Sequence, residues 1–435
     1  MSVPLRLPLA AVLAAGLAGP ATVPDSHAVQ SMYQAGVPHT DAQGSPRSHY
    51  GAGSFFPRCI YHAMPGSLAA IRDAGFNCVH TWEGLGVGDM IGELRATGLQ
   101  LIRHQPTDDE VRRFASDPRI LGWYLDEEPT SQTHLDMARS GNPGLMAERY
   151  QAFVSRMSAI KAMDPRHPVF VLDGPYAPPG LGAWWDRWNS SGDVSAHDYY
   201  PLRPGAADLS GMAESVLRAA RLTGERKPVW ITLQAFGGLP GLEVPLRMPA
   251  ADELRGMAFT AIIHGATGLI FFAYDSRVTR EGHVVGIAPD TPENRGGGAE
   301  ATPAEAARSR ELWSGAAALN AELERLTPAL LSPTARLPYE VRFAGDNRTA
   351  VPIRTMLKAT AGGYTLLAVN LEASPMGVRF RLPAAVVGSV RRLNPDGSAT
   401  VLEAFDGEFG DALGGFGAGV YEITASLDRP LGSRR

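Results

Sequence analysis

Three consecutive carboxylates close an apolar segment of the chain, residues 120–130, whose sequence is ILGWYLDEEPT. Its first half, with β-branched and aromatic side chains, is typical of a buried strand. Pro129 has no amide hydrogen to donate to a strand ladder, so the strand must end at Asp126, Glu127 and Glu128. Burying a carboxylate without partners costs free energy, which makes this strand end a candidate site for chemistry. The alternative is an exposed acidic loop that caps the next helix.

Apolar strand-like runs alternate with helical runs across most of the chain. Helical runs carry start signals, such as the capping box of Thr107 and Glu110, and stop signals, such as Gly75. Eight strand–helix units over about 270 residues predict a (β/α)8 TIM barrel at 53–331, in the α/β class. An open doubly wound sheet is the alternative, but no glycine-rich phosphate loop follows the first strand. The predicted strands are 55–62, 78–82, 99–104, 120–128, 169–173, 194–199, 229–234 and 268–274, and the predicted helices are 68–74, 89–96, 107–115, 145–163, 211–222, 251–264 and 302–326.

After Pro333 the pattern changes from strand–helix units to strands alone. Alternating apolar and polar residues are separated by turn sequences at 361–363 and 394–397. This pattern predicts a small all-β sandwich at 332–428, with a scaffold role rather than a binding role. Its predicted strands are 350–359, 364–371, 377–382, 387–393 and 419–423.

Polar side chains gather where the predicted barrel strands end, while the strand bodies are apolar. In a (β/α)8 barrel the carboxyl ends of the strands share one rim, and catalytic groups lie there. The residues at these ends are Tyr61, His62, His80, Trp82, Glu83, His104, Asp126, Glu127, Glu128, Asp173, His197, Asp198, Tyr199, Tyr200, Gln234, Phe236, Tyr274 and Asp275.

With these residues the chain resembles the glycoside hydrolases of clan A, TIM-barrel glycosidases with a C-terminal β-sandwich. In that clan the fourth strand ends in Asn-Glu-Pro, and its glutamate is the general acid/base. The matching residues here are Glu127, Glu128 and Pro129, so the resemblance places Glu128 in the acid/base position. Glu127 replaces the asparagine that usually contacts the sugar 2-hydroxyl. An Asp/Glu-Glu-Pro variant also occurs in poorly characterised barrel proteins that resemble this clan.

The chain departs from the clan at the end of the seventh strand. The clan has a glutamate nucleophile there, whereas this chain has Gln234, and an amide cannot form a glycosyl ester. The second carboxylate could come from elsewhere on the rim, with Asp198 the first choice. Weaker candidates are Asp275, Glu83 and Glu243.

Two further explanations of Gln234 remain. The protein could bind sugars without hydrolysing them. Alternatively Glu127 and Glu128 could both act, although adjacent residues of an extended strand normally point to opposite faces.

The resemblance implies cleavage of O-glycosidic bonds in an oligo- or polysaccharide, without a cofactor. This reaction needs one protonated carboxyl and one ionised carboxylate, about 5–5.5 Å apart for retention and about 6.5–9.5 Å apart for inversion. Three carboxyls at one strand end raise the pKa of at least one of them, as a general acid requires. Because the usual nucleophile is absent, inversion is favoured over retention, with Glu128 as general acid and Asp198 as base or nucleophile.

Other rim residues are expected to contact the sugar, since pyranose faces stack on aromatic rings and hydroxyls need polar partners. His197 could bind the Asp198 carboxylate or a substrate hydroxyl, or it could be a histidine satisfied within the rim. The tryptophans at 184, 185 and 188 either stack on sugar or pack a helix against the barrel, whereas Trp123 and Trp230 are expected in the core. The predicted substrate contacts are Glu127, His197, Tyr199, Gln234, Trp82, His62, Tyr274 and Asp275.

Other classes of function have weaker support. A metal-dependent hydrolase could use His62, His80, His104 and Asp198, but the first strand lacks the His-x-His of such barrels, so no metal is expected. No Gly-x-Ser-x-Gly nucleophile elbow follows a strand. A net charge of −5 without a basic cluster gives no indication of a nucleic-acid partner.

The first residues resemble a secretory signal peptide. Arg6 precedes an apolar stretch at 7–19, too short to span a bilayer, and Ser-His-Ala at 26–28 is a plausible cleavage site. Residues 1–28 are therefore expected to be removed, and the protein is expected to be secreted or periplasmic, with no membrane span. Residues 29–52 are polar and aperiodic and are predicted to form a loose lead-in. The oligomeric state is left open.

The chain has only two cysteines, Cys59 and Cys78. Export favours disulfides, but both cysteines fall within predicted core strands. Two buried free thiols are therefore expected in preference to a bridge.

Overall fold

The computed structural model describes residues 32–41, 45–47, 54–81, 84–175, 180–238, 246–279, 282–288, 303–343 and 352–425. The predicted signal peptide lies outside the described residues, as do Trp82, Glu83 and Glu243. The chain divides into two compact units, of which one spans Met32–Thr334 and the other begins at Ala335.

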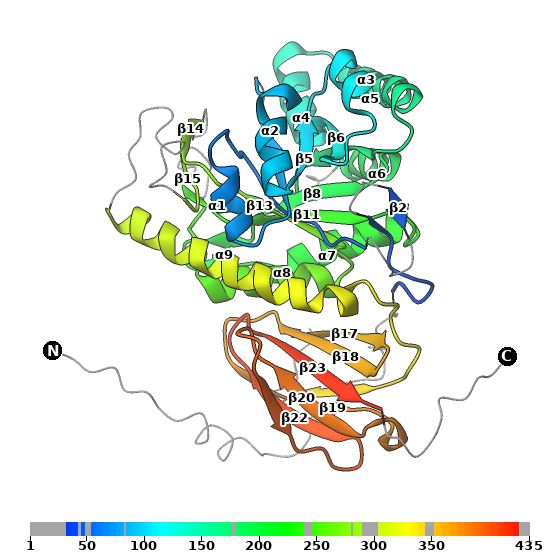
Figure 1. Ribbon diagram of the computed structural model, residues 1–435, viewed down its shortest axis with the longest axis vertical. Helices are drawn as coiled ribbons and strands as arrows, with labels where there is room; N and C mark the ends of the chain where they lie inside the picture. Colours follow the sequence, from blue (N-terminus) through cyan, green and yellow to red (C-terminus); the bar gives the residue numbers. More distant parts are fainter. Residues whose placement is uncertain are drawn as a thin grey trace. The chain divides into compact units, whose positions relative to one another are not determined.

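Eight parallel strands close into a barrel in the first unit, which confirms the predicted fold (Figure 1). Neighbours around the barrel follow chain order throughout, with β11 between β8 and β13, and β13 closing the barrel against β3. The carboxyl ends of all eight strands therefore meet at one rim, as the placement of the site requires. The barrel strands are β3 (Arg58–Ile60), β4 (Cys78–Thr81), β5 (Gln100–His104), β6 (Ile120–Glu127), β7 (Val169–Asp173), β8 (Ser195–Tyr199), β11 (Val229–Gln234) and β13 (Gly268–Phe272).

Helices surround the barrel, and most begin and end close to the predicted positions. Two were not among the predicted helices, α4 and α6. Helix α4 begins at Pro129, which fits a first helical turn because that turn needs no amide donor. No helix in the described part of the chain is long and apolar enough to cross a bilayer. The helices are α1 (Leu68–Asp73), α2 (Val87–Thr97), α3 (Asp108–Phe114), α4 (Pro129–Ser140), α5 (Leu145–Met163), α6 (Gly182–Ser191), α7 (Leu209–Leu222), α8 (Ala251–Ile263) and α9 (Pro303–Leu330).

The predicted free thiols are wrong, because Cys59 and Cys78 form a disulfide. The two residues are directly opposite each other in the parallel pair β3–β4, with Cα atoms 4.4 Å apart. This separation lies within the range that a disulfide spans. The sequence shows that each cysteine is in a strand, but not which residue of the next strand faces it.

Removing this cross-link is expected to destabilise the protein. The bond closes a 19-residue separation, and a loop of this size gives about 3 kcal/mol of stability in the chain-entropy account. We therefore expect Cys59→Ala with Cys78→Ala to lower the free energy of unfolding in urea by about that amount. Reduced wild-type protein is the control, since it keeps both sulfurs without the bond. Equal stability of oxidised and reduced wild type would contradict the prediction.

The lead-in differs from the loose segment predicted. Its described residues pack against the barrel unit: the buried Tyr33 hydroxyl donates to Gly265 O at 2.5 Å, and Tyr33 N donates to Glu225 Oε2 at 2.8 Å. Strand β1 (His39–Thr40) pairs with β2 (Pro46–Arg47). The partners of Tyr33 are distant in sequence, so no local pattern indicates these two contacts.

The second unit contains two antiparallel sheets, as predicted for a small β-sandwich. Their apolar side chains form a core of their own around Phe380, Phe409 and Tyr421. The predicted strands are present, but β16, β21 and β22 were missed, and β16 and β21 carry no fully buried residue that would give a clear alternation. One sheet has the order β16 (Glu340–Phe343), β19 (Met376–Arg381), β22 (Glu408–Leu413), and the other β17 (Ile353–Thr360), β18 (Gly363–Asn370), β23 (Ala418–Thr424), β20 (Ser389–Leu393), β21 (Ala399–Leu402).

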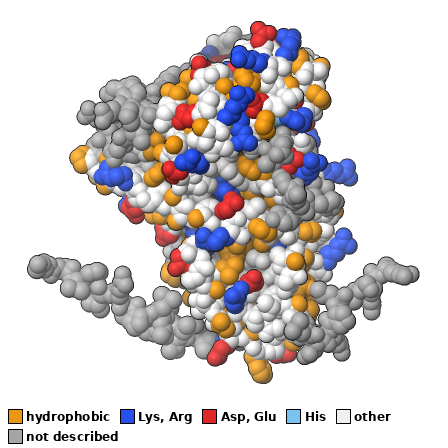
Figure 2. Space-filling model, viewed as in Figure 1, with side chains coloured by type: hydrophobic (Ala, Val, Ile, Leu, Met, Phe, Trp, Pro, Cys, Tyr) orange, Lys and Arg blue, Asp and Glu red, His pale blue; other side chains and the backbone are white. Residues whose placement is uncertain are grey.

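Short strands lie in the loops that follow β8, β11 and β13. They are β9 (Leu202–Arg203), β10 (Ala206–Ala207), β12 (Gly237–Gly238), β14 (Arg277–Thr279) and β15 (Gly282–Val285). Positive and negative side chains are interspersed over the face shown in Figure 2. This mixture agrees with the small net charge of the sequence.

Candidate active site

The end of β6 departs from regular strand geometry. Its register with β7 shifts between Tyr124 and Glu127, and Glu128 has a left-handed backbone with φ 43° and ψ 47°. A left-handed conformation is uncommon for a residue other than glycine. As a result Glu127 and Glu128 do not face opposite ways, and both act electrostatically on the Asp198 carboxyl. The objection to two adjacent acting carboxylates is therefore removed.

Glu128 is held at the junction between β6 and α4. Its amide donates to Leu172 O at 2.7 Å, which ties the turn to β7. Its Oε2 accepts from Ser131 Oγ at 3.1 Å and from Gln132 Nε2 at 3.4 Å. The half-buried carboxylate is thus oriented by the first turn of α4.

Asp198 lies on the same rim as Glu128, at the end of β8, and only 2% of it is exposed. Burial raises its pKa well above the usual range, and the charge of Glu128 and a hydrogen bond with it raise the pKa further. Its Oδ1 has no hydrogen-bond partner in the part of the chain that the structure describes. The structure therefore brings together the two carboxyls predicted to be catalytic, in an environment that favours the protonated form of Asp198.

Asp173, at the end of β7, caps the unpredicted helix α4. Its Oδ1 accepts from Thr130 N at 3.0 Å, and its Oδ2 accepts from Thr130 Oγ1 at 2.6 Å. Burial raises the pKa of Asp173 to about 7, although these hydrogen bonds act in the opposite direction. The carboxyl that holds the start of α4 thus titrates near neutral pH.

Tyrosines complete the surroundings of the carboxyls. Tyr61, which follows β3, donates to the hydroxyl of Tyr124 on β6 at 3.1 Å. Burial, followed by the charge of Glu127, raises the pKa of both hydroxyls far above the usual value. The hydroxyl of Tyr200 hydrogen-bonds with Asp198 and acts to lower the pKa of that carboxyl. None of these three tyrosines was among the predicted substrate contacts.

His197 and Tyr199 were predicted to contact the substrate, but they flank Asp198 on β8, and successive residues of a strand point to opposite faces. His197 Nε2 hydrogen-bonds with Ser215 Oγ of α7 at 3.1 Å, and Tyr199 donates to Asp208 at 2.6 Å. Burial lowers the pKa of His197 to about 3. Both side chains thus face the helices rather than a substrate as predicted, and of the alternatives for His197 the bond to Asp198 is not formed. The alternation that excludes them also indicates Tyr200, two residues after Asp198.

Gln234 is on the same face of β11 as the core residue Trp230, but its amide is fully engaged. Its Oε1 accepts from Leu202 N at 2.9 Å, and its Nε2 donates to Leu202 O at 3.0 Å and Arg247 O at 2.8 Å. In this structure Gln234 fastens the loops after β8 and β11 to the barrel. It is not free to contact a substrate as predicted.

His62 and Asp275, both predicted contacts, lie together at the rim. His62 Nδ1 and Asp275 Oδ1 are 3.0 Å apart, and His62 has a left-handed backbone with φ 62°. Tyr274 points the other way, with its ring 5.5 Å from that of Trp313 on α9, so its predicted contact with substrate is not supported. Tyr274 and Asp275 both follow the end of β13 at Phe272, so their orientations are set by the bend after the strand.

The tryptophan cluster belongs mainly to the packing of α6. Trp185 and Trp188 are fully buried, and Trp185 Nε1 donates to Gly174 O at 3.1 Å. Trp184 is half-buried, with the Arg187 guanidinium over its ring. Trp123 and Trp230 are fully buried, as predicted. For Trp185 and Trp188 the helix-packing alternative is therefore confirmed.

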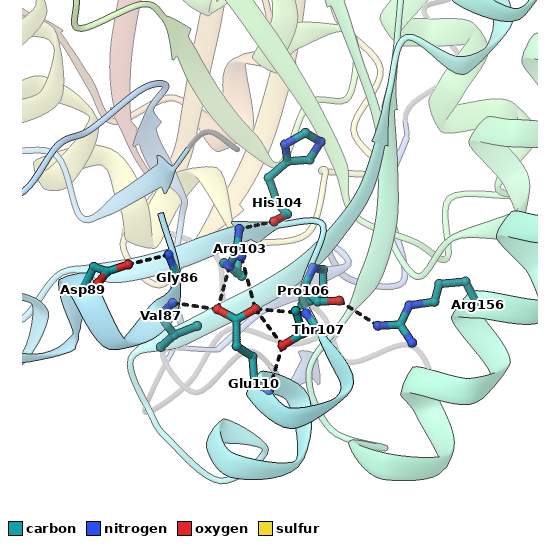
Figure 3. Close-up of polar contacts among 9 residues, drawn as sticks. All are labelled: Gly86, Val87, Asp89, Arg103, His104, Pro106, Thr107, Glu110 and Arg156. Carbon is teal, nitrogen blue, oxygen red and sulfur yellow. Dashed lines mark hydrogen bonds and ion pairs between the residues drawn. The ribbon is translucent and has the colours of Figure 1, made fainter. Parts of the chain in front are cut away.

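A polar network fixes the end of β5 (Figure 3). Glu110 accepts two bonds from Arg103, at 3.0 and 3.1 Å, and others from the amides of Val87 and Thr107. Arg103 also donates to the carbonyl of His104. The network joins the starts of α2 and α3 to β5, the strand that carries His104. Burial lowers the pKa of the His104 ring to about 4. Among the described residues, no group of three His, Cys, Asp or Glu is arranged to hold a metal ion.

No protein-family model matches the chain, and no curated protein sequence matches it. Solved structures similar to it include AmyP in complex with maltose, at 13% identity and TM-score 0.49, covering 83% of this chain and 90% of that one. A GH30 endoxylanase from Clostridium papyrosolvens C71 is 11% identical with TM-score 0.44, covering 89% and 99%. Amy13B of Eubacterium rectale is 9% identical with TM-score 0.48, covering 91% and 98%. The strand pairing described above, rather than these similarities, establishes the barrel.

Proposed function

We propose that this protein is an exported glycoside hydrolase that cleaves O-glycosidic bonds of an oligo- or polysaccharide with Glu128 and Asp198. The observation that supports the proposal most strongly is the meeting of these two carboxyls at the barrel rim, where burial raises the pKa of Asp198. A neutral and an ionised carboxyl are the pair that glycoside hydrolysis requires. No cofactor is part of the proposal.

The electrostatics support roles opposite to those expected from the sequence. A general acid must hold its proton at the working pH, and the raised pKa of Asp198 gives it that property. Glu128 then supplies the negative charge, either by attacking the anomeric carbon or by stabilising positive charge on it. We propose Asp198 as the acid and Glu128 as the nucleophile or stabilising carboxylate.

The contact between the two carboxyls bears on stereochemistry. Inversion requires about 6.5–9.5 Å between the carboxyls, to admit a water molecule, whereas retention requires about 5–5.5 Å. Glu128 acts on the pKa of Asp198 at short range, both by its charge and as a hydrogen-bond partner. The contact therefore supports retention rather than the inversion expected from the absent nucleophile. Proton NMR of the first product formed from a cleaved substrate tests this, because retention preserves the anomeric configuration. An inverted first product would contradict it.

Catalysis is tested by a panel of polysaccharides and aryl glycosides, assayed for new reducing ends with wild type and with Glu128→Gln. We expect the wild type to cleave at least one member and the variant to bind that member without cleaving it. Cleavage that is unaffected by the substitution would remove Glu128 from the mechanism.

The second candidate is a barrel that binds carbohydrate without cleaving it. The observation in its favour is Gln234, an amide engaged with backbone groups at the position of the clan's nucleophile. Binding of a glycan by the wild type without release of reducing ends would select this candidate.

Restoring the clan's nucleophile is not expected to restore the clan's reaction. Gln234→Glu replaces the donor Nε2 by an acceptor that faces the carbonyls of Leu202 and Arg247. One carboxylate oxygen keeps the Leu202 amide as donor, but the other is buried against two carbonyls. This repulsion is costly, so we expect a loss of about 3 kcal/mol in the free energy of unfolding and no gain in turnover. Gln234→Met, of similar volume and uncharged, is the control for lost hydrogen bonds alone. Increased turnover in Gln234→Glu would contradict the prediction.

Export is proposed from the signal-like residues 1–28, and the disulfide agrees with it, since disulfides persist in oxidising compartments. Mass spectrometry of protein recovered outside the cytoplasm tests the proposal. A mature chain that lacks the first 28 residues is the expected result.

A further inference from the structure

A cavity of about 460 Å³ opens where β3 and β4 begin, far from the proposed active site. Arg58 is the first residue of β3, and Asn77 immediately precedes β4. In a barrel of parallel strands the strand beginnings lie at the end opposite the catalytic rim. Helix α9 contributes Asn320 and Glu324 to the lining. The volume is within the range of small-molecule sites in proteins.

One wall of the cavity is cross-linked. Asn77 Oδ1 accepts from Arg58 N at 2.8 Å, and Asn77 Nδ2 donates to Phe56 O at 3.0 Å. The disulfide joins Cys59 to Cys78, the residues that follow Arg58 and Asn77. This wall is therefore formed before any ligand arrives, which lowers the cost of binding.

The opposite wall is formed where the end of α1 meets α9. Gly75, with a left-handed φ of 78°, accepts from Arg58 Nε at 3.2 Å, and Ala74 O accepts from Asn320 Nδ2 at 3.0 Å. A Cβ added at Gly75 would lie 3.0 Å from Asn320 Cβ. These close contacts anchor the Arg58 and Asn320 side chains at their positions in the lining.

Two arginines of the lining have guanidinium N–H groups that make no hydrogen bond with the described residues. Arg58 is 4% exposed; its Nε and Nη2 are bonded, to Gly75 and Glu324, but Nη1 makes no hydrogen bond within the described part of the chain. Arg72 likewise uses Nε and Nη2 for Asp73. Glu324 is the only carboxylate among the described lining residues, beside two guanidinium groups, and the carboxylate that pairs with Arg72, Asp73, is not part of the lining.

The apolar part of the lining is largely aromatic, from Phe55, Phe56 and Phe76. Aromatic rings bind flat or C–H-rich faces, and guanidinium donors bind carboxylates. We propose that this cavity is a second binding site, which takes a small organic acid with one carboxylate on a six-membered ring. Sugar acids and aromatic acids share this chemistry.

Calorimetric titration of the whole protein tests the proposal with D-glucuronate and benzoate as probes and D-glucose as the uncharged control. Ala321 lines the cavity from an exposed position on α9, so Ala321→Trp blocks the space without changing the core. Arg72→Met removes one unused donor. We expect at least one acid to bind, glucose not to bind at this site, and each variant to weaken binding about tenfold or more. Near-ultraviolet circular dichroism checks that both variants are folded.

The active-site variant Glu128→Gln separates the two ends of the barrel. The proposal requires that it bind the acid as the wild type does, whatever becomes of glycan cleavage. Binding lost in Glu128→Gln but kept in Ala321→Trp would assign the acid to the catalytic rim and overturn the proposal. No binding of either acid at about 10 mM would also overturn it. Whichever of the two acids binds more tightly shows whether the site prefers a hydroxylated or an aromatic ring.

Discussion

Replacing Glu128 by glutamine is expected to lower the turnover of a cleaved glycan by about 10³–10⁴-fold. The amide keeps the size of the side chain and an oxygen that can accept from Ser131, so the turn at the start of α4 is retained. It lacks the negative charge that the developing cation requires. The affinity for substrate should therefore change much less than the turnover number. Initial rates and equilibrium binding of the same glycan measure the two separately.

Asp198→Asn is expected to cause a loss of similar size, because an amide cannot supply the proton to the leaving group. The two substitutions together should cost little more than either alone, since the residues act as one unit. Glu214→Gln, at an exposed position on α7, is the matched control and should leave turnover unchanged. A double variant whose loss equals the product of the single losses would show that the carboxyls act independently, and the pair would fail as the catalytic unit.

The location of the candidate site was predictable because barrel topology converts a one-dimensional pattern into a position. Apolar runs that end in polar residues indicate where strands end, and parallel strands place those ends together. This was sufficient to bring Glu128 and Asp198 to one rim, although they are 70 positions apart in the chain.

The orientation of individual side chains was predictable only in part. Strand alternation, applied along β8, would have replaced His197 and Tyr199 by Tyr200. On β6 the same rule fails, because a register shift and the left-handed Glu128 redirect the strand end. The pairing of Cys59 with Cys78 and the engagement of Gln234 depend on which backbone lies opposite each side chain. Such pairings are properties of the assembled barrel and leave no local signature.

The buried carboxyl of Asp173 is expected to make the protein less stable as the pH rises from about 4 to about 7. Below this range the carboxyl is protonated in both the folded and the unfolded chain, so it does not affect folding. Between the usual pKa of 3.8 and the folded value of about 7, the unfolded chain releases the proton while the folded chain keeps it. The difference corresponds to about 4 kcal/mol lost across the range.

Asp173→Asn isolates this contribution, because an asparagine can keep both contacts of the cap. Its oxygen accepts from Thr130 N, and its amide group donates to Thr130 Oγ1, which reverses the direction of the present bond. We expect the free energy of unfolding of the variant, minus that of wild type, to rise by about 4 kcal/mol between pH 4 and pH 7. Asp109→Asn is the control, since the Asp109 side chain is 98% exposed and gains no effect from burial. A difference that stays constant with pH in urea titrations would mean that Asp173 is ionised in the folded protein. The start of α4, from which Glu128 is oriented, would then be held by a charged cap.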